Sequence, residues 1–171
     1  MEHCDAAIAQ VEPKLQLSNN KDEQDVDPTQ YRRFIGSLRY LCNTLPDMAF
    51  NVGIVSRFMG RPKMSHLEAV KRILRYVKGY VGSEILFTAS NMGRKYNLLG
   101  FIDSNWCGDK DDRKFTTWYI FIFSGTPTTW CSKKELVVAL SSCETKYIAA
   151  SLCVPSCVAY KFITRAGQQL G

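Results

Sequence analysis

The sequence contains no apolar run near the roughly 18 residues that a helix needs to span a bilayer. Its first five residues, Met-Glu-His-Cys-Asp, are acidic and lack the apolar stretch of a secretory signal. The seven cysteines are odd in number, include no CxxC pair and are accompanied by only two histidines. We therefore expect no membrane span, no disulfide framework and no structural zinc site, and we expect a reducing, cytoplasmic or nuclear location.

Composition and length are those of a folded chain. The 171 residues are 46% hydrophobic and 22% charged, which excludes a wholly disordered chain, a coiled coil and a collagen. A chain of this length can bury a core as one domain, or as two small ones.

Charge is distributed unevenly along the chain. The net charge is +6, yet residues 1–30 hold seven acids and two lysines, a net of −5. Residues 31–78 hold ten Lys or Arg and two acids, a net of +8. The middle of the chain is therefore a candidate polyanion-binding surface, although a solvated set of helix faces explains the charge equally well.

The first half of the chain reads as an arm followed by helices. Residues 1–27 end in an acidic, polar run and predict an extended, mobile arm. Three helices are expected over residues 28–82: one from 28 to about 45, one from 47 to about 60, and one from 65 to 79.

Caps and apolar stripes support these helices. Asp27 can cap the first helix, and Ser65 with Glu68 has the spacing of a capping box at the start of the third. Apolar residues recur at i, i+3 and i+4 spacing. The expected buried residues are Tyr31, Phe34, Ile35, Leu38 and Leu41 in the first helix, and Leu67, Val70, Leu74 and Val77 in the third.

Strand signals follow the helices. Aromatic and β-branched runs predict strands over 84–88, 96–102, 116–123 and 128–132. A last helix opens at Ser142, with an expected apolar face of Tyr147, Ile148, Leu152 and Phe162. The sequence thus predicts an α+β fold, with a helical subdomain over 28–82 and an α/β subdomain over 83–171.

Two carboxylates are the candidate chemical groups. Asp103 ends an apolar strand, at a sheet edge that a metal or a phosphate can reach. Glu144 falls in the first turn of the last helix, where the helix dipole alone justifies it. Together the two could share a hard divalent cation such as Mg²⁺ or Mn²⁺.

Several segments together resemble the Pol polyprotein of copia-type retrotransposons. The similarity covers nearly the whole chain, including the arm. It is carried by 31–41 (YRRFIGSLRYL), 71–79 (KRILRYVKG), 103–108 (DSNWCG), 130–134 (WCSKK) and 138–142 (VALSS).

The resemblance implies where the chain lies within the polyprotein and which reaction the family catalyses there. The matching stretch of the family holds the end of the reverse transcriptase, a helical connection and the first half of an RNase H domain, here three to four strands plus the first helix. RNase H enzymes cut the RNA strand of an RNA–DNA hybrid with two Mg²⁺ or Mn²⁺ ions held by carboxylates. Asp103 matches the first carboxylate, and is the expected metal ligand.

This chain departs from the family pattern. The family's catalytic glutamate is replaced by Lys146, and Glu144 lies two residues away, about 200° around the helix. Asn105 and Cys107 replace an acid and an alanine, and Trp118 replaces a glycine. Pro155 falls inside the last helix, and the chain ends before the strand that supplies a third carboxylate. We therefore expect a vestigial catalytic site and no nuclease or polymerase activity.

The leading hypothesis is a catalytically inactive fragment that retains weak binding to an RNA–DNA hybrid or another nucleic acid. The expected contacts are Lys71, Arg72, Arg75, Lys78, Ser104 and Asn105. Because the truncated domain leaves a sheet edge uncovered, self-association through that edge is also expected.

Two alternatives remain. The first alternative is a non-enzymatic effector. Residues 72–75 have the sequence RILR, which matches the RxLR motif of secreted oomycete effectors, and some of those effectors resemble copia fragments. The other is a metal-dependent RNase H in which a partner chain completes the carboxylate set.

Overall fold

The computed structural model describes residues 4–12, 17–19, 22–80 and 97–169. The chain forms two compact units. Residues 1–86 and 109–113 make the helical unit, and residues 87–108 and 114–171 make the sheet unit. Among the described residues, no helix is long and apolar enough to cross a membrane.

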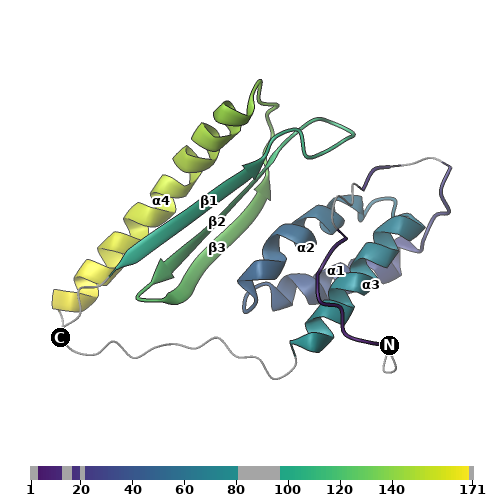
Figure 1. Cartoon of the computed structure of the whole chain (residues 1–171), viewed down its shortest axis with the longest axis horizontal. Coiled ribbons are helices and arrows are strands. Elements are labelled where there is room, and N and C mark those ends of the chain that lie inside the picture. Colours follow the sequence, from purple (N-terminus) through teal and green to yellow (C-terminus); the bar gives the residue numbers. More distant parts are fainter. Residues whose placement is uncertain (1–3, 13–16, 20–21, 81–96, 170–171) are drawn as a thin grey trace. The chain divides into compact units, whose positions relative to one another are not determined.

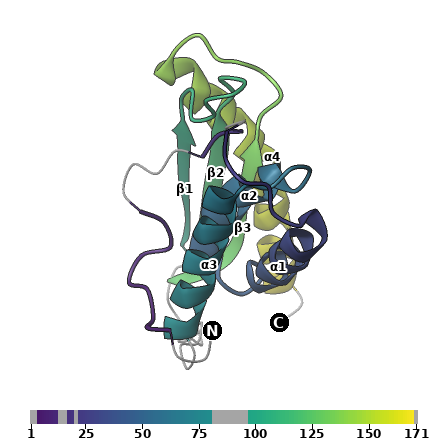
Figure 2. The ribbon, with the colours of Figure 1, turned by 90° about the vertical axis from the view of Figure 1, so that its right-hand side faces the viewer.

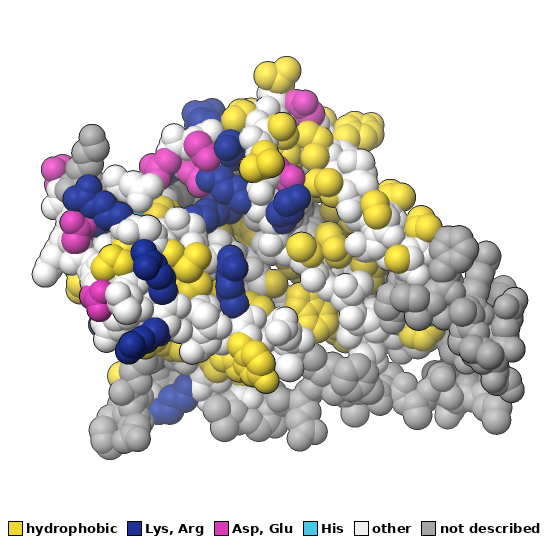
Figure 3. Space-filling model, turned by 180° about the vertical axis from the view of Figure 1, so that it is seen from behind, with side chains coloured by type: hydrophobic (Ala, Val, Ile, Leu, Met, Phe, Trp, Pro, Cys, Tyr) yellow, Lys and Arg dark blue, Asp and Glu magenta, His cyan; other side chains and the backbone are white. Residues whose placement is uncertain are grey.

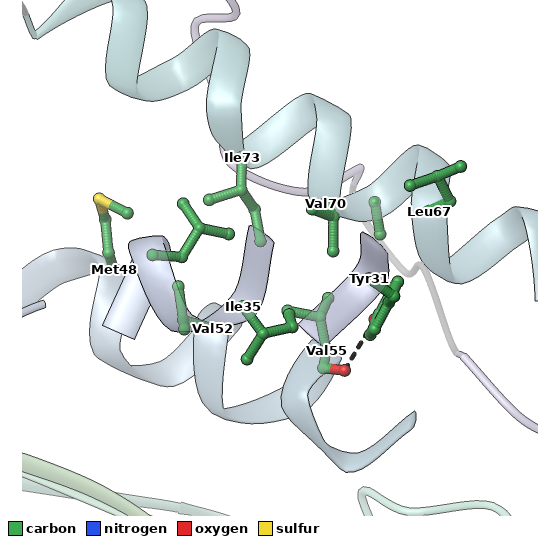
Figure 4. Packing of buried hydrophobic residues seen from close by; sticks show 10 residues of the cluster. Tyr31, Ile35, Met48, Val52, Val55, Leu67, Val70 and Ile73 are labelled. Carbon is green, nitrogen blue, oxygen red and sulfur yellow. Dashed lines mark hydrogen bonds between the residues drawn. The ribbon is translucent and has the colours of Figure 1, made fainter. Parts of the chain in front are cut away.

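The helical unit consists of α1 (Pro28–Leu41), α2 (Ala49–Val55) and α3 (Met64–Gly79), with 3₁₀ turns at Pro46–Met48 and Ser56–Phe58. The helices pack around one apolar cluster (Figure 4). Within it, the Tyr31 hydroxyl donates to the Val55 carbonyl over 2.8 Å, so the buried phenol is paired. The cluster comprises Tyr31, Ile35, Leu38, Met48, Val52, Val55, Leu67, Ala69, Val70 and Ile73.

Details of two helices differ from the sequence prediction. The first helix ends at Leu41 instead of near residue 45. The third begins at Met64, so the expected cap at Ser65 is wrong. Ile73 is fully buried, whereas Leu74 and Val77 are only partly buried, because the core side of α3 is rotated from the expected stripe.

The sheet unit is a three-stranded antiparallel sheet with one helix on one face (Figures 1 and 2). Its strands are β1 (Leu98–Asn105), β2 (Thr116–Phe123) and β3 (Thr126–Lys134), in the order β1-β2-β3, followed by α4 (Ser142–Gln169). β2 has the predicted bounds, β3 extends beyond its prediction at both ends, and β1 begins two residues later and ends three residues later than predicted. The strand expected over 84–88 lies outside the described residues.

The predicted apolar face of α4 is wrong for Tyr147 and Leu152, whereas Ile148 is partly buried. Tyr147 is 80% exposed and Leu152 is 41% exposed, while the side chain of Phe162 lies outside the description. Small side chains face the sheet instead, because they let the helix backbone approach it closely. These buried residues are Thr145, Ala149 and Cys153, spaced four apart along the helix.

Pro155 does not end α4, which continues to Gln169. A proline inside a helix removes the hydrogen bond to the carbonyl of the residue four positions earlier, here Ser151. Both Ser151 and Pro155 are exposed, so water can reach the carbonyl that loses its partner. The architecture is therefore α+β in the predicted order: three helices, a three-stranded antiparallel sheet and a C-terminal helix.

Candidate functional site

Asp103 lies inside β1, third from its end, and pairs with Trp118 of β2. Its carboxylate is exposed and accepts the backbone N–H of Ser104 over 2.8 Å. Directly opposed residues of an antiparallel pair place their side chains on the same face. An indole therefore stands beside the carboxylate.

The strand register directs Asp103 away from α4. The neighbouring Ser104 points at the helix, because its hydroxyl donates to Thr145 Oγ1 over 3.0 Å. Successive side chains of a strand point to opposite faces. Asp103 therefore lies on the face that α4 does not cover, together with Leu99 and Phe101.

Glu144 lies in the first turn of α4 and serves the helix start. Its carboxylate accepts the backbone N–H of Leu140 over 2.6 Å, and its own N–H donates to Ser141 Oγ over 3.1 Å. Lys146, two positions on, is exposed. Leu140 precedes the helix, so Glu144 closes the loop before α4, and its position in the first turn suits the helix dipole.

The donor set does not fit the two-metal centre that the resemblance implies. Glu144 is engaged at the helix start, and Asp103 faces away from that helix. Across residues 4–12, 17–19, 22–80 and 97–169, no group of three His, Cys, Asp or Glu side chains could hold a metal ion. A pair of Mg²⁺ or Mn²⁺ ions needs several carboxylates in one cluster.

Ser104 and Asn105 have structural partners instead of a free surface. The Asn105 side chain accepts the Thr116 N–H over 2.7 Å, which ties the ends of β1 and β2 together. The same side chain lies directly against Gly108, where a Cβ would collide with its amide. These two expected nucleic-acid contacts therefore hold the sheet unit together.

The four expected cations of α3 lie along one part of the helix, and we call Lys71, Arg72, Arg75 and Lys78 the basic face. Lys71 is exposed. The other three donate to the N-terminal segment, residues 4–12, which runs beside α3 (Figure 1).

Sequence reasoning missed a second basic cluster in the helical unit. Lys63 is 2% exposed and contacts Asp25 over 2.7 Å, and Arg61 contacts the same carboxylate over 3.1 Å. These two cations lower the pKa of Asp25 to about 2. The cations border a pocket of about 410 Å³ lined by Asn19, Arg57, Phe58, Gly60, Arg61 and Lys63. Nothing in the sequence signals the pairing, because Asp25 lies in the segment expected to be a mobile arm.

Several curated proteins similar to this chain are retrotransposon polyproteins. The retrovirus-related Pol polyprotein from transposon RE1 of Arabidopsis thaliana is 40% identical over 135 residues, which cover 79% of this chain and 9% of the polyprotein. The polyprotein from transposon TNT 1-94 of Nicotiana tabacum is 45% identical over 122 residues, covering 71% of this chain and 9% of the polyprotein. The chain thus spans about a tenth of these relatives.

A shorter relative has a different name. Secreted RxLR effector protein 161 of Plasmopara viticola is 38% identical over 122 residues, which cover 71% of this chain and 84% of that protein. No family model and no solved structure matches the chain. The chain is therefore homologous to copia-type retrotransposon Pol polyproteins over 71–79% of its length, and it is also similar to a secreted RxLR effector protein.

Proposed function

We propose that the chain is the part of a copia-type Pol polyprotein in which the helical connection meets the first half of an RNase H domain, and that it binds nucleic acid without cutting it. The similarity to Pol polyproteins and the order of helices, sheet and helix support this assignment. The observation that carries the loss of cleavage is the commitment of Glu144 to the start of α4.

Three further features argue against hybrid cleavage. Lys146 puts a positive charge at the position of the family's glutamate, where a metal ion would be repelled. Asp103 points to the face of the sheet opposite α4, and Trp118 occupies the adjacent position on that face. A single exposed carboxylate binds a divalent ion too weakly to position two of them. No catalytic step is therefore assigned to these residues.

Nucleic-acid binding is supported by the charge of the helical unit. Residues 31–78 carry a net charge of +8, and α3 contributes four cations over two helical turns. Guanidinium groups bind phosphate through paired hydrogen bonds, and lysines add point charge. Figure 3 shows Lys and Arg side chains on one face of the molecule, with Asp and Glu close to several of them.

A salt titration of hybrid binding tests the proposal. Fluorescence anisotropy of a labelled RNA–DNA hybrid gives the affinity of the full chain at several salt concentrations. About four phosphate contacts would lower the affinity roughly a hundredfold between 50 and 200 mM salt, because each contact releases a counterion. An affinity that is flat over this range contradicts binding through the basic face.

One pair of variants localises the binding. Lys71 is exposed and has no hydrogen bond or ion pair with other described residues, so Lys71→Gln is expected to remove a charge without disturbing the fold. This change is expected to weaken binding and to reduce the salt slope by about 1. Lys133→Gln in β3, which removes the same charge from an exposed site, is the matched control. Equal effects of both variants would argue against the basic face.

A second candidate function is that of a non-enzymatic effector, which the similarity to the secreted RxLR effector favours. In this chain the RxLR string lies inside α3, where Ile73 is fully buried and Arg72 and Arg75 bond to residues 4–12. The string is thus part of a packed helix. Expression in plant cells, read by cell death, tests the effector role. Loss of cell death in Arg72→Ala with Arg75→Ala would support that role, and no response from the unaltered chain would exclude it.

A further inference from the structure

The basic face is in contact with the segment at residues 4–12, which we call the cover segment. Arg72 donates from Nε to the Ala9 carbonyl over 3.2 Å and from Nη1 to the Glu12 carboxylate over 3.0 Å. Arg75 Nε donates to the Asp5 carbonyl over 3.2 Å. Lys78 Nζ donates to the Cys4 carbonyl over 3.0 Å. Three of the four cations therefore already have oxygen acceptors from one short segment.

All four acceptors are oxygen atoms, as the phosphate oxygens of a nucleic acid would be. They are carbonyl oxygens and one carboxylate, spaced along an extended chain that runs beside the helix. Nucleic-acid phosphates offer the same groups a stronger, charged acceptor. The cover segment receives the Nε–H groups of Arg72 and Arg75 and one N–H of Lys78, so a phosphate backbone that takes these same N–H groups must displace it.

Apart from its bonds with the basic face, the cover segment is attached to the helical unit by one backbone bond and by the side chain of Gln10. The Ala7 N–H donates to the Arg75 carbonyl over 3.2 Å. Gln10 is 8% exposed; its side chain donates to Asp47 over 3.0 Å and accepts from Asn51 over 2.7 Å. The side chain of Ile8, in contrast, is 99% exposed. Exposed ion pairs such as that of Glu12 add little to this attachment.

We propose that the cover segment is an intramolecular competitor that occupies the phosphate-binding groups of α3 and is displaced when a nucleic acid binds. This inference rests on the proposed function, and it adds a regulation of the same site. The proposal gives a role to the opposite net charges of the N-terminal residues, which are acidic, and of the helices, which are basic. Lys71, which has no bonded partner among the described residues, provides the first phosphate contact, and the other three cations become available as the segment leaves.

Two neutral substitutions in the full chain test the competition. Ala7→Pro removes the backbone donor, and Gln10→Ala removes both side-chain bonds, so the double variant detaches the segment without changing the net charge. Ile8→Ala is the matched control, because its side chain makes no contact. The double variant is expected to bind the labelled hybrid several-fold more tightly than Ile8→Ala. Its salt slope should match that of Ile8→Ala, because in both complexes the segment has left and the same four cations contact phosphate.

The outcomes separate the two proposals. If the double variant matches Ile8→Ala in affinity while Lys71→Gln weakens binding, the competition is wrong and the basic face stands. If neither the double variant nor Lys71→Gln changes binding, the basic face itself is wrong. Weaker binding by the double variant also overturns the competition, because the segment would then assist the ligand.

Hydrogen exchange on the unaltered chain gives an independent readout. Mass spectrometry of the peptide covering residues 4–12, with and without saturating hybrid, follows protection of the Ala7 amide. Displacement predicts faster exchange of this peptide in the complex. Unchanged or slower exchange would show that the segment stays in place, and would overturn the proposal.

Discussion

His66 shows how closely one side chain is held in the helical unit. It is fully buried and stacks on Phe58 with ring centroids 3.8 Å apart. Its Nδ1 accepts the Lys63 N–H over 3.0 Å, so Nε2 carries the proton in the assigned tautomer and donates to the Ser18 carbonyl over 3.1 Å. Burial lowers the pKa of His66, although Glu23 and Asp111 nearby raise it in part. Protonation would replace the acceptor at Nδ1 with a second donor facing the Lys63 amide.

The free energy of unfolding is therefore expected to fall with acid. With a lowered folded-state pKa, the unfolded chain binds the His66 proton first, so stability is full above pH 6.5 and declines as pH drops below it. The pKa of Asp25, at about 2, affects stability only below about pH 4. Urea unfolding between pH 7.5 and 5 measures the effect, and His66→Gln should flatten it. Stability that rises toward pH 5 would contradict this reading.

Two glycines are expected to respond to alanine in opposite ways. A Cβ at Gly100 would lie 2.8 Å from the Phe121 ring, so Gly100→Ala should destabilise the sheet unit by about 1–3 kcal/mol. A Cβ at Gly36 in α1 meets nothing within 4 Å, so Gly36→Ala should stabilise the helical unit by about 0.5–1 kcal/mol. Thermal unfolding of both variants measures whether each change lowers or raises stability. A Gly100→Ala variant as stable as the unaltered chain would contradict the close contact between Gly100 and Phe121.

At the scale of elements, α3 depends on a residue far from it in sequence. Glu23 accepts from both the backbone N–H and the hydroxyl of Ser65, which satisfies donors at the start of the helix. The sequence pointed to a local cap, Ser65 with Glu68, because local spacing was the only signal. Likewise, the exposed Tyr147 and Leu152 made the apolar pattern of α4 misleading. Where the local signal was strong, the predicted structure is correct, as it is for the Asp27 cap of α1 and for the bounds of β2.

Removing the distant cap should weaken the helical unit. Glu23→Ala leaves the Ser65 amide without its acceptor and is expected to cost about 0.5–2 kcal/mol of unfolding free energy. Glu68→Ala, an exposed change on the same helix, is the control and should stay within about 0.5 kcal/mol. Urea unfolding measures both. Equal losses of unfolding free energy in the two variants would mean that the Glu23 cap does not stabilise the helical unit.

The outer strands of the sheet are where we expect the chain to self-associate. β1 and β3 are the outer strands of the described sheet, and Phe101 on β1 is 52% exposed. Apolar side chains on an outer strand favour pairing between chains. Sedimentation velocity is therefore expected to show concentration-dependent association that Phe101→Lys reduces. A monomer at all concentrations would exclude association through this strand.

At the scale of the whole molecule, the two units differ in how completely they bury apolar surface. The helical unit has a continuous buried cluster, whereas the sheet unit exposes Leu99, Phe101 and Trp106. The sequence predicted the α+β order and the basic helix. It could not place Asp103 relative to α4, because the strand register sets that orientation, nor the cover segment on α3, because those contacts join residues 60 or more apart.

The most direct test of the account follows the RNA strand of a bound hybrid. A hybrid with a 5′-labelled RNA strand is incubated with a saturating excess of the full chain and Mg²⁺ or Mn²⁺, and the RNA is resolved on a denaturing gel. The account predicts an intact strand while anisotropy shows the hybrid bound. Metal-dependent fragments that disappear with Asp103→Asn would contradict it, and would establish an active RNase H.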